Sequence, residues 1–286
     1  MQELVLKAYA KINLALAIQN RRRDGYHNLS TIMQTVSIYD RVTLKKSNQI
    51  TCNINDDFIP SGEKNIAFKA AKVFFEFTGI DAGVDIVIDK KIPYGAGMGG
   101  GSADAAAVFL GLNKLYCANV SENSLVQLAS KVGADVPFLL KGGTALAEGI
   151  GEIITNIKPL PECNILIVKP SISVSTVDAY NEYDKLADEA KNSVNYLIPY
   201  LEQGDLDGLC CGLFNDFERV VAGTTINKIK GQMMARGALT SCMTGSGSAV
   251  FGIYRDFETA DGARIEFEKG GFLSFVCEPV KKLLIN

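Results

Sequence analysis

GAGMGGGSADAAA, from Gly95 to Ala107, is the stretch of this 286-residue sequence that says most about its fold and chemistry. It follows a predicted strand over residues 84–88 and leads into a predicted Ala-rich helix over residues 103–115. The backbone N–H groups of such a loop can converge on one anion, and the helix N-terminus adds the positive end of its dipole. Glycines suit the loop because any Cβ would hold the backbone away from a phosphate. The pattern therefore predicts a phosphate-binding loop between a strand and a helix.

Other interpretations of this loop remain open from the residues alone. Gly95, Gly97 and Gly100 match the dinucleotide motif G-x-G-x-x-G, but the parallel strand that should follow, with an acidic residue at its end, is missing. A P-loop needs G-x-x-x-x-G-K-[ST], and the sequence contains no Gly-Lys-Ser or Gly-Lys-Thr. Close packing of a helix on a strand without any ligand is a third alternative. A second Gly-rich segment, MTGSGSAVFG at 243–252, predicts a hairpin when taken alone and could approach the same phosphates when paired with the first.

Strands and helices are mixed along the chain, which predicts an α+β protein with two domains, residues 1–158 and 159–286. The boundary rests on a change of character after Lys158, where Pro159 and Pro161 flank a short connection. Apolar residues at every even position of 4–18 predict a strand with one buried face. Further strands are predicted over residues 32–38, 41–44, 50–54, 84–88, 164–168, 238–243, 249–254 and 273–277. Helices are predicted over residues 65–77, 103–115, 121–132, 176–186, 193–201, 206–221 with breaks, 225–236 and 257–268.

The composition excludes several classes of protein. With 47% hydrophobic and 21% charged residues the chain is an ordinary globular protein, and a net charge of −3 argues against a nucleic-acid partner. The seven cysteines form no C-x-x-C pair, which predicts reduced thiols and a cytoplasmic location. No apolar run reaches the roughly 18 residues of a membrane span, so no membrane association is expected. A single histidine rules out a His-rich metal site. For the oligomeric state, we expect a monomer or weak homodimer.

Three segments resemble the three motifs of the GHMP kinases, in the same order and at similar spacing. They are KAYAKINLALAI at 7–18, the Gly-rich loop after Pro93, and MTGSGSAVFG. DGYH at 24–27, GADVPF at 133–138 and NDFE at 215–218 are more specific, and they are similar to segments of those members that phosphorylate a cytidine diphosphate conjugate. The resemblance covers essentially the whole chain. It implies a ribosomal S5-like N-terminal ATP-binding domain, a ferredoxin-like C-terminal substrate-binding domain, and transfer of the γ-phosphoryl group of ATP to a hydroxyl at a site between them.

The resemblance also implies which residues carry the chemistry. Lys11, which alone would read as a solvated strand lysine, matches the catalytic lysine, whose ammonium stabilises charge on the transferring phosphoryl group. Asp135, which alone would read as a helix cap before Pro137, matches the residue that contacts the acceptor hydroxyl, as general base or as orienter. Tyr26 and Tyr180 are expected to sandwich the cytosine, and His27 to hydrogen-bond to it. The residues expected on the acceptor substrate are Asn13, Tyr26, His27, Thr176 and Tyr180.

On the ATP side, the resemblance implies a cradle for the triphosphate and contacts to the adenosine. The residues concerned are Asn65, Lys90, Pro93, Gly95, Gly97, Gly99, Gly100, Gly101, Ser102 and Asp104. Ser102 is also a candidate oxygen ligand for Mg²⁺, which the phosphates and waters would mainly hold. Asp104 stands where the family pattern is expected to have Asn or Ser, and a carboxylate near phosphates is unfavourable unless it faces the sugar or the metal.

Two alternatives to this function remain. The chain could be another GHMP kinase that acts on a smaller alcohol, or a catalytically inactive nucleotide-binding module. The presence of both Lys11 and Asp135 argues against the inactive module. A dependence of substrate preference on Tyr26 would separate a cytidine-specific kinase from a kinase of smaller alcohols.

Overall fold

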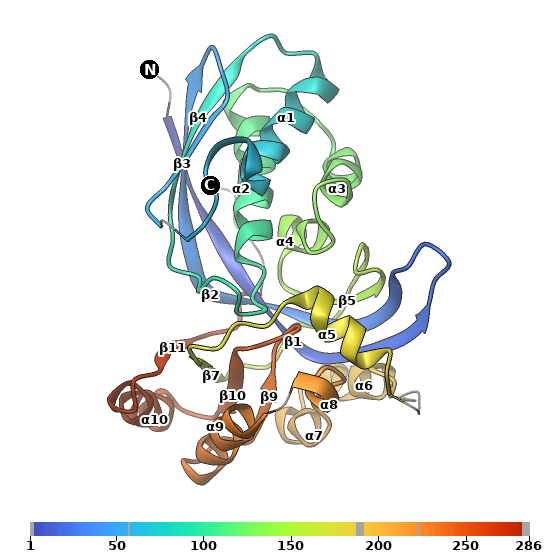
Figure 1. Cartoon of the computed structure of the whole chain (residues 1–286), viewed down its shortest axis with the longest axis vertical. Helices are drawn as coiled ribbons and strands as arrows, with labels where there is room; N and C mark the ends of the chain where they lie inside the picture. Colours follow the sequence, from blue (N-terminus) through green and yellow to red (C-terminus); the bar gives the residue numbers. More distant parts are fainter. Residues whose placement is uncertain (1–2, 57, 187–191, 222, 282–286) are drawn as a thin grey trace.

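The computed structural model describes residues 3–56, 58–186, 192–221 and 223–281, in which two β-sheets lie one above the other (Figure 1). The upper sheet of the figure is seven-stranded, with the order β3-β4-β2-β1-β8 and with β5 paired to β2 and β6. Its strands are β1 (Glu3–Arg21), β2 (His27–Ser47), β3 (Thr51–Ile54), β4 (Gly83–Asp89), β5 (Thr144–Gly149), β6 (Ile153–Asn156) and β8 (Phe214–Asn215). The lower sheet has the order β11-β7-β10-β9. Its strands are β7 (Asn164–Lys169), β9 (Thr240–Met243), β10 (Val250–Tyr254) and β11 (Leu273–Cys277).

Helices cover one face of the upper sheet, and α2 packs on β1 and β2 at its centre (Figure 1). These helices are α1 (Ile66–Thr78), α2 (Gly100–Leu115), α3 (Glu122–Ser130) and α4 (Val136–Lys141). Helices α9 (Thr224–Ala235) and α10 (Phe257–Lys269) pack on the lower sheet. The other helical segments are η1 (Gly62–Lys64), α5 (Thr176–Tyr183), η2 (Asn195–Leu197), α6 (Ile198–Gln203), α7 (Leu206–Cys211) and α8 (Glu218–Val221). As the sequence predicts, α1 stops at Gly79, which has the left-handed φ of a helix C-cap (66°).

Strands β1 and β2 form a long antiparallel pair at the centre of the upper sheet. Two details of the sequence prediction are wrong here. The strands expected over 32–38 and 41–44 are one strand, because Asp40 between them is buried within β2 instead of ending it. Residues 8–18 of β1 are covered on both faces, because α2 lies on one side and the turn after β9 lies against the polar side. Register shifts on both sides of Lys11 and Asn13 mark bulges, which can redirect side chains beside an active site.

Several short elements differ from the sequence prediction. β5, β6 and α4 were not predicted, because each is six residues or fewer and too short for a periodic pattern. α2 begins at Gly100, earlier than the predicted start at residue 103. The sequence does not predict this first turn because glycine has low helix propensity. The interrupted helix expected over 206–221 is α7, then β8, then α8.

Strand β8 connects the two halves of the chain. It pairs in parallel with β1, with Phe214 opposite Ala15 and Asn215 opposite Leu16. A segment from the second half therefore completes the sheet that the first half mainly builds. The predicted boundary after Lys158 lies in the connection between β6 and β7 and stays a prediction.

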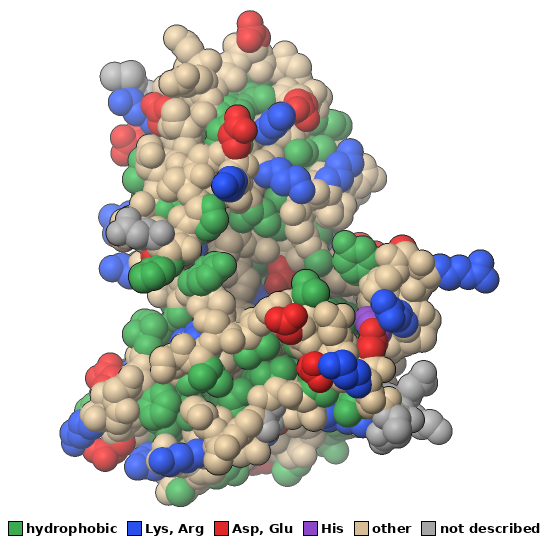
Figure 2. All heavy atoms as spheres, viewed as in Figure 1, with side chains coloured by type: hydrophobic (Ala, Val, Ile, Leu, Met, Phe, Trp, Pro, Cys, Tyr) green, Lys and Arg blue, Asp and Glu red, His purple; other side chains and the backbone are tan. Residues whose placement is uncertain are grey.

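Lys and Arg side chains are interspersed with Asp and Glu on the face drawn in Figure 2, so this face carries no broad basic patch. Among the described residues, no helix is both long and apolar enough to cross a membrane.

Candidate active site

Two cavities meet at the first Gly-rich loop. The larger, of about 570 Å³, is lined by residues of β1, β2 and α5 and by the turn after β9. The smaller, of about 330 Å³, is lined by residues near η1, by the start of α1 and by the loop itself. Gly97, Gly99 and Ser102 line both cavities. A group held at this loop can therefore face ligands in both.

The predicted site residues sort into these two cavities as the sequence grouped them. The larger cavity is lined by the catalytic and acceptor-side residues Lys11, Asn13, Tyr26, His27, Asp135, Thr176 and Tyr180. The smaller is lined by the ATP-side residues Asn65, Lys90, Pro93, Gly95, Gly97, Gly99, Gly100, Gly101, Ser102 and Asp104. Their placement agrees with the prediction, while the role of each residue toward a ligand stays a prediction.

The loop presents unpaired backbone donors to the smaller cavity. Gly99 is the N-cap of α2 with a left-handed φ of 69°, and no side chain caps this helix. The first N–H groups of an α-helix have no partner within the helix, so those of Gly100, Gly101 and Ser102 are available to an anion. The first turn of α2 also contains no acidic residue. This geometry suits the phosphate cradle expected from the sequence, and binding of a phosphate there stays a prediction.

The second Gly-rich segment is both a hairpin turn and a neighbour of the first. It joins the antiparallel strands β9 and β10, as predicted for a hairpin. A Cβ on Gly97, whose φ is 73°, would lie 2.2 Å from the carbonyl oxygen of Thr244. The two glycine-rich turns are therefore in direct contact although they are far apart in the sequence. Whether the second turn touches the same phosphates stays a prediction.

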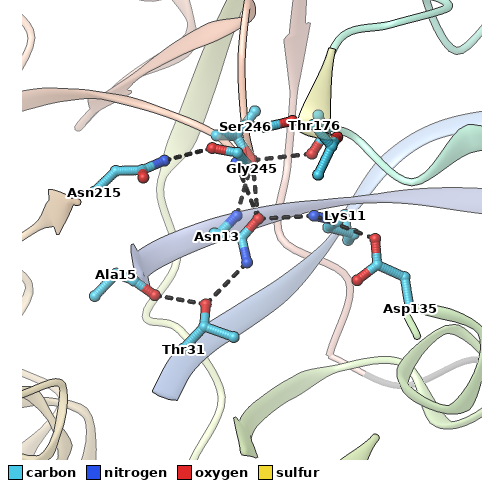
Figure 3. A network of polar contacts seen from close by, with 11 residues as sticks. Lys11, Asn13, Ala15, Thr31, Asp135, Thr176, Asn215, Gly245 and Ser246 are labelled. Atoms are coloured by element: carbon cyan, nitrogen blue, oxygen red, sulfur yellow. Dashed lines mark hydrogen bonds and ion pairs between the residues drawn. The ribbon is translucent and has the colours of Figure 1, made fainter. Parts of the chain in front are cut away.

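Lys11 lies in a buried polar network at the junction of the cavities (Figure 3). Its Nζ donates to Oδ1 of Asn13 at 2.7 Å and lies 3.5 Å from Oδ2 of Asp135. Asn13 in turn donates through Nδ2 to Oγ1 of Thr31 at 2.8 Å. The Lys11 side chain is only 4% exposed. The interpretation as a solvated strand lysine is therefore wrong, because the ammonium is fixed inside the site.

Asp135 occupies the N-cap position of α4 but does not act as a cap. Its backbone is already in the helical region and its side chain accepts no capping hydrogen bond. Pro137 also lacks one of the two N–H groups that a capping carboxylate usually accepts. Among the described residues the carboxylate contacts only the Lys11 ammonium, and 29% of the side chain is exposed toward the cavity. It is thus available to an acceptor hydroxyl.

An aromatic cluster forms the far end of the larger cavity. The rings of His27 and Tyr180 stack with centroids 5.0 Å apart, and Tyr180 meets Phe217 edge-on at 4.9 Å. His27 Nε2 is 2.7 Å from Oδ1 of Asp184. Tyr26 stands at the rim with 62% of its surface exposed. His27 covers one face of the Tyr180 ring, and the predicted sandwich of cytosine between Tyr26 and the other face of Tyr180 stays a prediction.

Sequence reasoning missed several residues that support these side chains. Asp184 and Phe217 hold His27 and Tyr180, and Ser246 accepts or donates a 2.8 Å hydrogen bond with Thr176. A polar or aromatic residue that acts on a partner so distant in the chain leaves no local pattern. The NDFE segment contains Phe217 and the second Gly-rich segment contains Ser246, so these two motifs could have drawn attention to them, whereas no motif marks Asp184.

Behind the smaller cavity, Lys90 is held between two buried carboxylates. Its Nζ donates to Oδ2 of Asp40 and, at 2.7 Å, to Oδ2 of Asp104. Oδ1 of Asp40 accepts the backbone N–H groups of Lys91 and Ile92, so this residue also fixes the start of the loop. Oδ2 of Asp104 thus accepts a hydrogen bond from Lys90, while a contact between Asp104 and ATP stays a prediction. Oδ1 of Asp104 is buried without a partner among the described residues.

Asn65, which is expected to contact the adenosine, also caps a helix. Its Oδ1 accepts the N–H of Ala67 to cap α1, and its Nδ2 donates to the carbonyl of Pro60. The side chain thus shapes the wall of the smaller cavity.

Replacing Asp104 by Asn is expected to stabilise the protein increasingly as the pH rises from about 5 to about 8. Burial raises the pKa of Asp104 to about 8 from an ordinary value of 3.8. Between these values folding takes up a proton on this carboxyl, so its contribution to stability falls as the pH rises and levels off above the folded pKa. Asn has no such proton linkage and leaves Lys90 paired with Asp40. Urea unfolding of both proteins across this range measures the effect, and a stability difference that does not change with pH would contradict it.

Comparisons with known proteins agree with this geometry. The model of the GHMP kinases N-terminal domain matches residues 65–143, and that of the GHMP kinases C-terminal domain matches residues 197–270. A 4-diphosphocytidyl-2-C-methyl-D-erythritol kinase of Caldicellulosiruptor saccharolyticus is 43% identical over 283 residues, which are 96% of this chain and 97% of the relative. The chain belongs to the GHMP kinase family. It is an ATP-dependent small-molecule kinase with the two-domain α+β fold of that family, as the sequence predicts.

Solved structures of GHMP kinases show the same arrangement. A crystal structure of 4-(cytidine 5'-diphospho)-2C-methyl-D-erythritol kinase is 32% identical, with a TM-score of 0.79 over 96% of this chain and 99% of that one. The mevalonate kinase of Methanococcus jannaschii shares the fold at 16% identity, with a TM-score of 0.73 over 98% of this chain and 99% of that one. The fold is therefore common to GHMP kinases with different acceptors, and the acceptor must be argued from the larger cavity.

Proposed function

We propose that this protein transfers the γ-phosphoryl group of ATP to the 2-hydroxyl of 4-diphosphocytidyl-2-C-methyl-D-erythritol, a step in the non-mevalonate synthesis of isoprenoid precursors. The observation that carries the proposal is the meeting of two cavities at one Gly-rich loop, with Lys11 and Asp135 on the acceptor side. The curated relative described above is a kinase of this substrate and matches along nearly the whole chain.

In this proposal each substrate occupies its own cavity. ATP lies in the smaller cavity with its phosphates against the N–H groups at the start of α2. The cytidine lies at the far end of the larger cavity, where Tyr26 offers an exposed ring and His27 a nitrogen. The erythritol part then points back toward Asp135, and its hydroxyl faces the phosphates across Gly97, Gly99 and Ser102.

Lys11 and Asp135 divide the chemistry between them. Phosphoryl transfer is catalysed mainly by positioning and by stabilising charge on the phosphoryl oxygens. The Lys11 ammonium supplies that charge from a buried position, where electrostatic interactions are stronger than in water. The Asp135 carboxylate accepts the proton of the attacking hydroxyl and orients its oxygen. Because the two groups are 3.5 Å apart, the ammonium can contact both the hydroxyl and the phosphoryl group.

We propose Mg²⁺ as the companion of ATP, with Ser102 as the protein ligand. The described residues contain no group of three or more His, Cys, Asp or Glu side chains that could hold a metal by themselves. Mg²⁺ is commonly bound by one or two protein groups plus substrate phosphates and waters. A single protein hydroxyl at the start of α2 is therefore a sufficient protein ligand when ATP supplies the phosphates. The ion would neutralise charge on the phosphates. The seven free cysteines support a reducing, cytoplasmic location for the reaction.

ADP release measured with a coupled assay tests the function. We expect rapid ADP formation with 4-diphosphocytidyl-2-C-methyl-D-erythritol and slow formation with mevalonate or homoserine at the same concentration. Equal rates with the smaller alcohols would favour the alternative kinase, and no ADP with any acceptor would favour the inactive module.

Replacing Tyr26 by Ala is expected to raise KM for the cytidine substrate by about 5- to 100-fold with a smaller change in kcat, because stacking of a base on an aromatic ring contributes about 1–3 kcal/mol. Tyr26 is mostly exposed, so its removal should leave the fold intact. Phe77→Ala removes a similarly exposed aromatic ring from α1, away from both cavities, and serves as the control. Steady-state kinetics at saturating ATP measure both. An unchanged KM in Tyr26→Ala would remove this residue from base recognition.

A further inference from the structure

The NDFE segment, residues 215–218, lies next to the second Gly-rich turn, and three of its residues have no role in the proposed reaction. Asn215 ends β8, pairs with Leu16 of β1 and is 5% exposed. It lines neither of the two substrate cavities. Its side chain nevertheless reaches the second Gly-rich turn, where it contacts Gly245 (Figure 3).

The amide of Asn215 is fully engaged with that turn. Its Nδ2 donates to the carbonyl of Met243 at 2.7 Å and to the carbonyl of Gly245 at 2.8 Å, while its Oδ1 accepts the N–H of Phe217 at 3.0 Å. Glu218 accepts the N–H of Met243 at 2.7 Å. Only Asn or Gln offers two donors and an acceptor on one planar group, and aspartate would aim a charged acceptor at two carbonyl oxygens. The segment therefore clamps the turn through its backbone.

The clamped turn continues to the reacting groups. The N–H of Gly245 donates to Oδ1 of Asn13 at 3.1 Å, and Oγ1 of Thr244 accepts the N–H of Asn13 at 3.0 Å. The same Oδ1 of Asn13 accepts from Nζ of Lys11 at 2.7 Å. This one oxygen thus accepts hydrogen bonds from both the Gly245 N–H and the Lys11 ammonium. Because a glycine turn has much backbone freedom, its position depends on the groups that hold its carbonyls.

We propose that Asn215 is a positioning residue for phosphoryl transfer: it fixes the Gly245 peptide, which fixes Asn13, which in turn fixes the ammonium of Lys11. The proposal rests on the proposed function only in taking Lys11 as the group that stabilises the phosphoryl charge. Asn215 contacts no substrate in this scheme. A small displacement of a positioned group can lower a rate by about 10²-fold. Loss of the clamp should therefore mainly lower kcat.

A double-mutant cycle between Asn215 and Asn13 tests this. Asn215→Asp is expected to lower kcat by about 10- to 100-fold. In an Asn13→Ala background the same change should lower kcat by no more than about twofold, because the relay is already broken. Asp216→Asn is the control, since this neighbour is equally buried but binds the N–H of Ile18 and the Asn192 side chain instead of the turn. A kcat unchanged by Asn215→Asp in folded protein, or equal losses in both backgrounds, would overturn the proposal.

Amide hydrogen exchange supplies a measurement that needs no substrate. Asn215→Asp should speed exchange over residues 243–247 and at the Lys11–Asn13 segment of β1, whereas Asp216→Asn should not. If the parent protein showed no turnover, the proposed function would fail while this comparison still tested the clamp. Should Asn215→Asp not fold, Asn215→Ala removes both donors without adding a charge and enters the same cycle. Unchanged exchange at both segments in a folded variant would overturn the proposal as well.

Discussion

Replacing Lys11 by Met lowers kcat by an expected factor of about 10³ or more, with little change in the fold. Methionine keeps the length and most of the volume of the side chain but removes the charge that faces the transferring phosphoryl group. Because the ammonium is buried and held by Asn13 and Asp135, no other cation among the described residues that line the larger cavity is placed to replace it at that junction. Arg21, which also lines the cavity, is paired with Asp184 at its far end.

Lys7→Met is the matched control for this change. Lys7 lies on the same strand, two pleats before Lys11 on the same side, but it is exposed and stacks over the ring of Tyr39. Its loss should leave kcat within about twofold of the parent, as for most surface substitutions. Rates of ADP release at saturating substrates, together with thermal unfolding of each variant, measure both effects. Substantial turnover by folded Lys11→Met would show that the ammonium is not the group that stabilises the transition state.

The sequence predicts this site well where the signal is local. The alternation of apolar and other residues over 4–18 places Lys11 and Asn13 side by side on one face of a strand. The glycine loop predicts a helix N-terminus. Each of these patterns reports an element and its neighbouring residues, because periodicity and turn chemistry act over a few positions. The assignment of roles to Lys11 and Asp135 came from the resemblance to a family and not from their spacing.

What the sequence does not predict are the contacts made across the chain. The oxygen of Thr244 lies against Gly97, and Asn215 holds the peptide of Gly245, although no local rule links these positions. Asp40 breaks the apolar pattern of β2, yet it is buried because it satisfies Lys90 and two backbone N–H groups. Polar residues that are buried for such a partner look like surface residues in the sequence, so the predicted break in β2 was wrong.

The environment of Asp135 is another long-range effect. A sequence of Asp before Val-Pro predicts a helix cap. The side chain of Asp135 instead accepts no capping hydrogen bond: its backbone is already helical, Pro137 lacks an N–H, and the Lys11 ammonium lies 3.5 Å from the carboxylate. The lack of a capping hydrogen bond leaves the carboxylate available for chemistry. The consequence can be measured with a substitution that leaves the helix untouched.

Asp135→Asn is therefore expected to lower kcat by about 10²- to 10⁴-fold, the range typical of general acid–base catalysis, with little change in KM for ATP. The amide keeps the shape of the carboxylate and can still accept a hydrogen bond, but it cannot take a proton. Because Asp135 caps nothing, thermal unfolding should change little. Asp256→Asn is the matched control, since Asp256 is the N-cap of α10 and its carboxylate does accept the N–H of Thr259. Because Asn caps a helix about as well as Asp, that variant should keep both its stability and its activity.

The size of the rate loss in Asp135→Asn decides between the two roles of Asp135. If the carboxylate takes the proton of the attacking hydroxyl, Asp135→Asn loses about 10²- to 10⁴-fold in kcat. If the carboxylate only orients the hydroxyl, little proton removal is needed in the transition state, and Asp135→Asn keeps more than about a tenth of the parent rate. The position of the side chain, open to the cavity and paired only with Lys11 among the described residues, favours the first outcome. A loss of less than about tenfold in folded Asp135→Asn would assign the carboxylate to orientation.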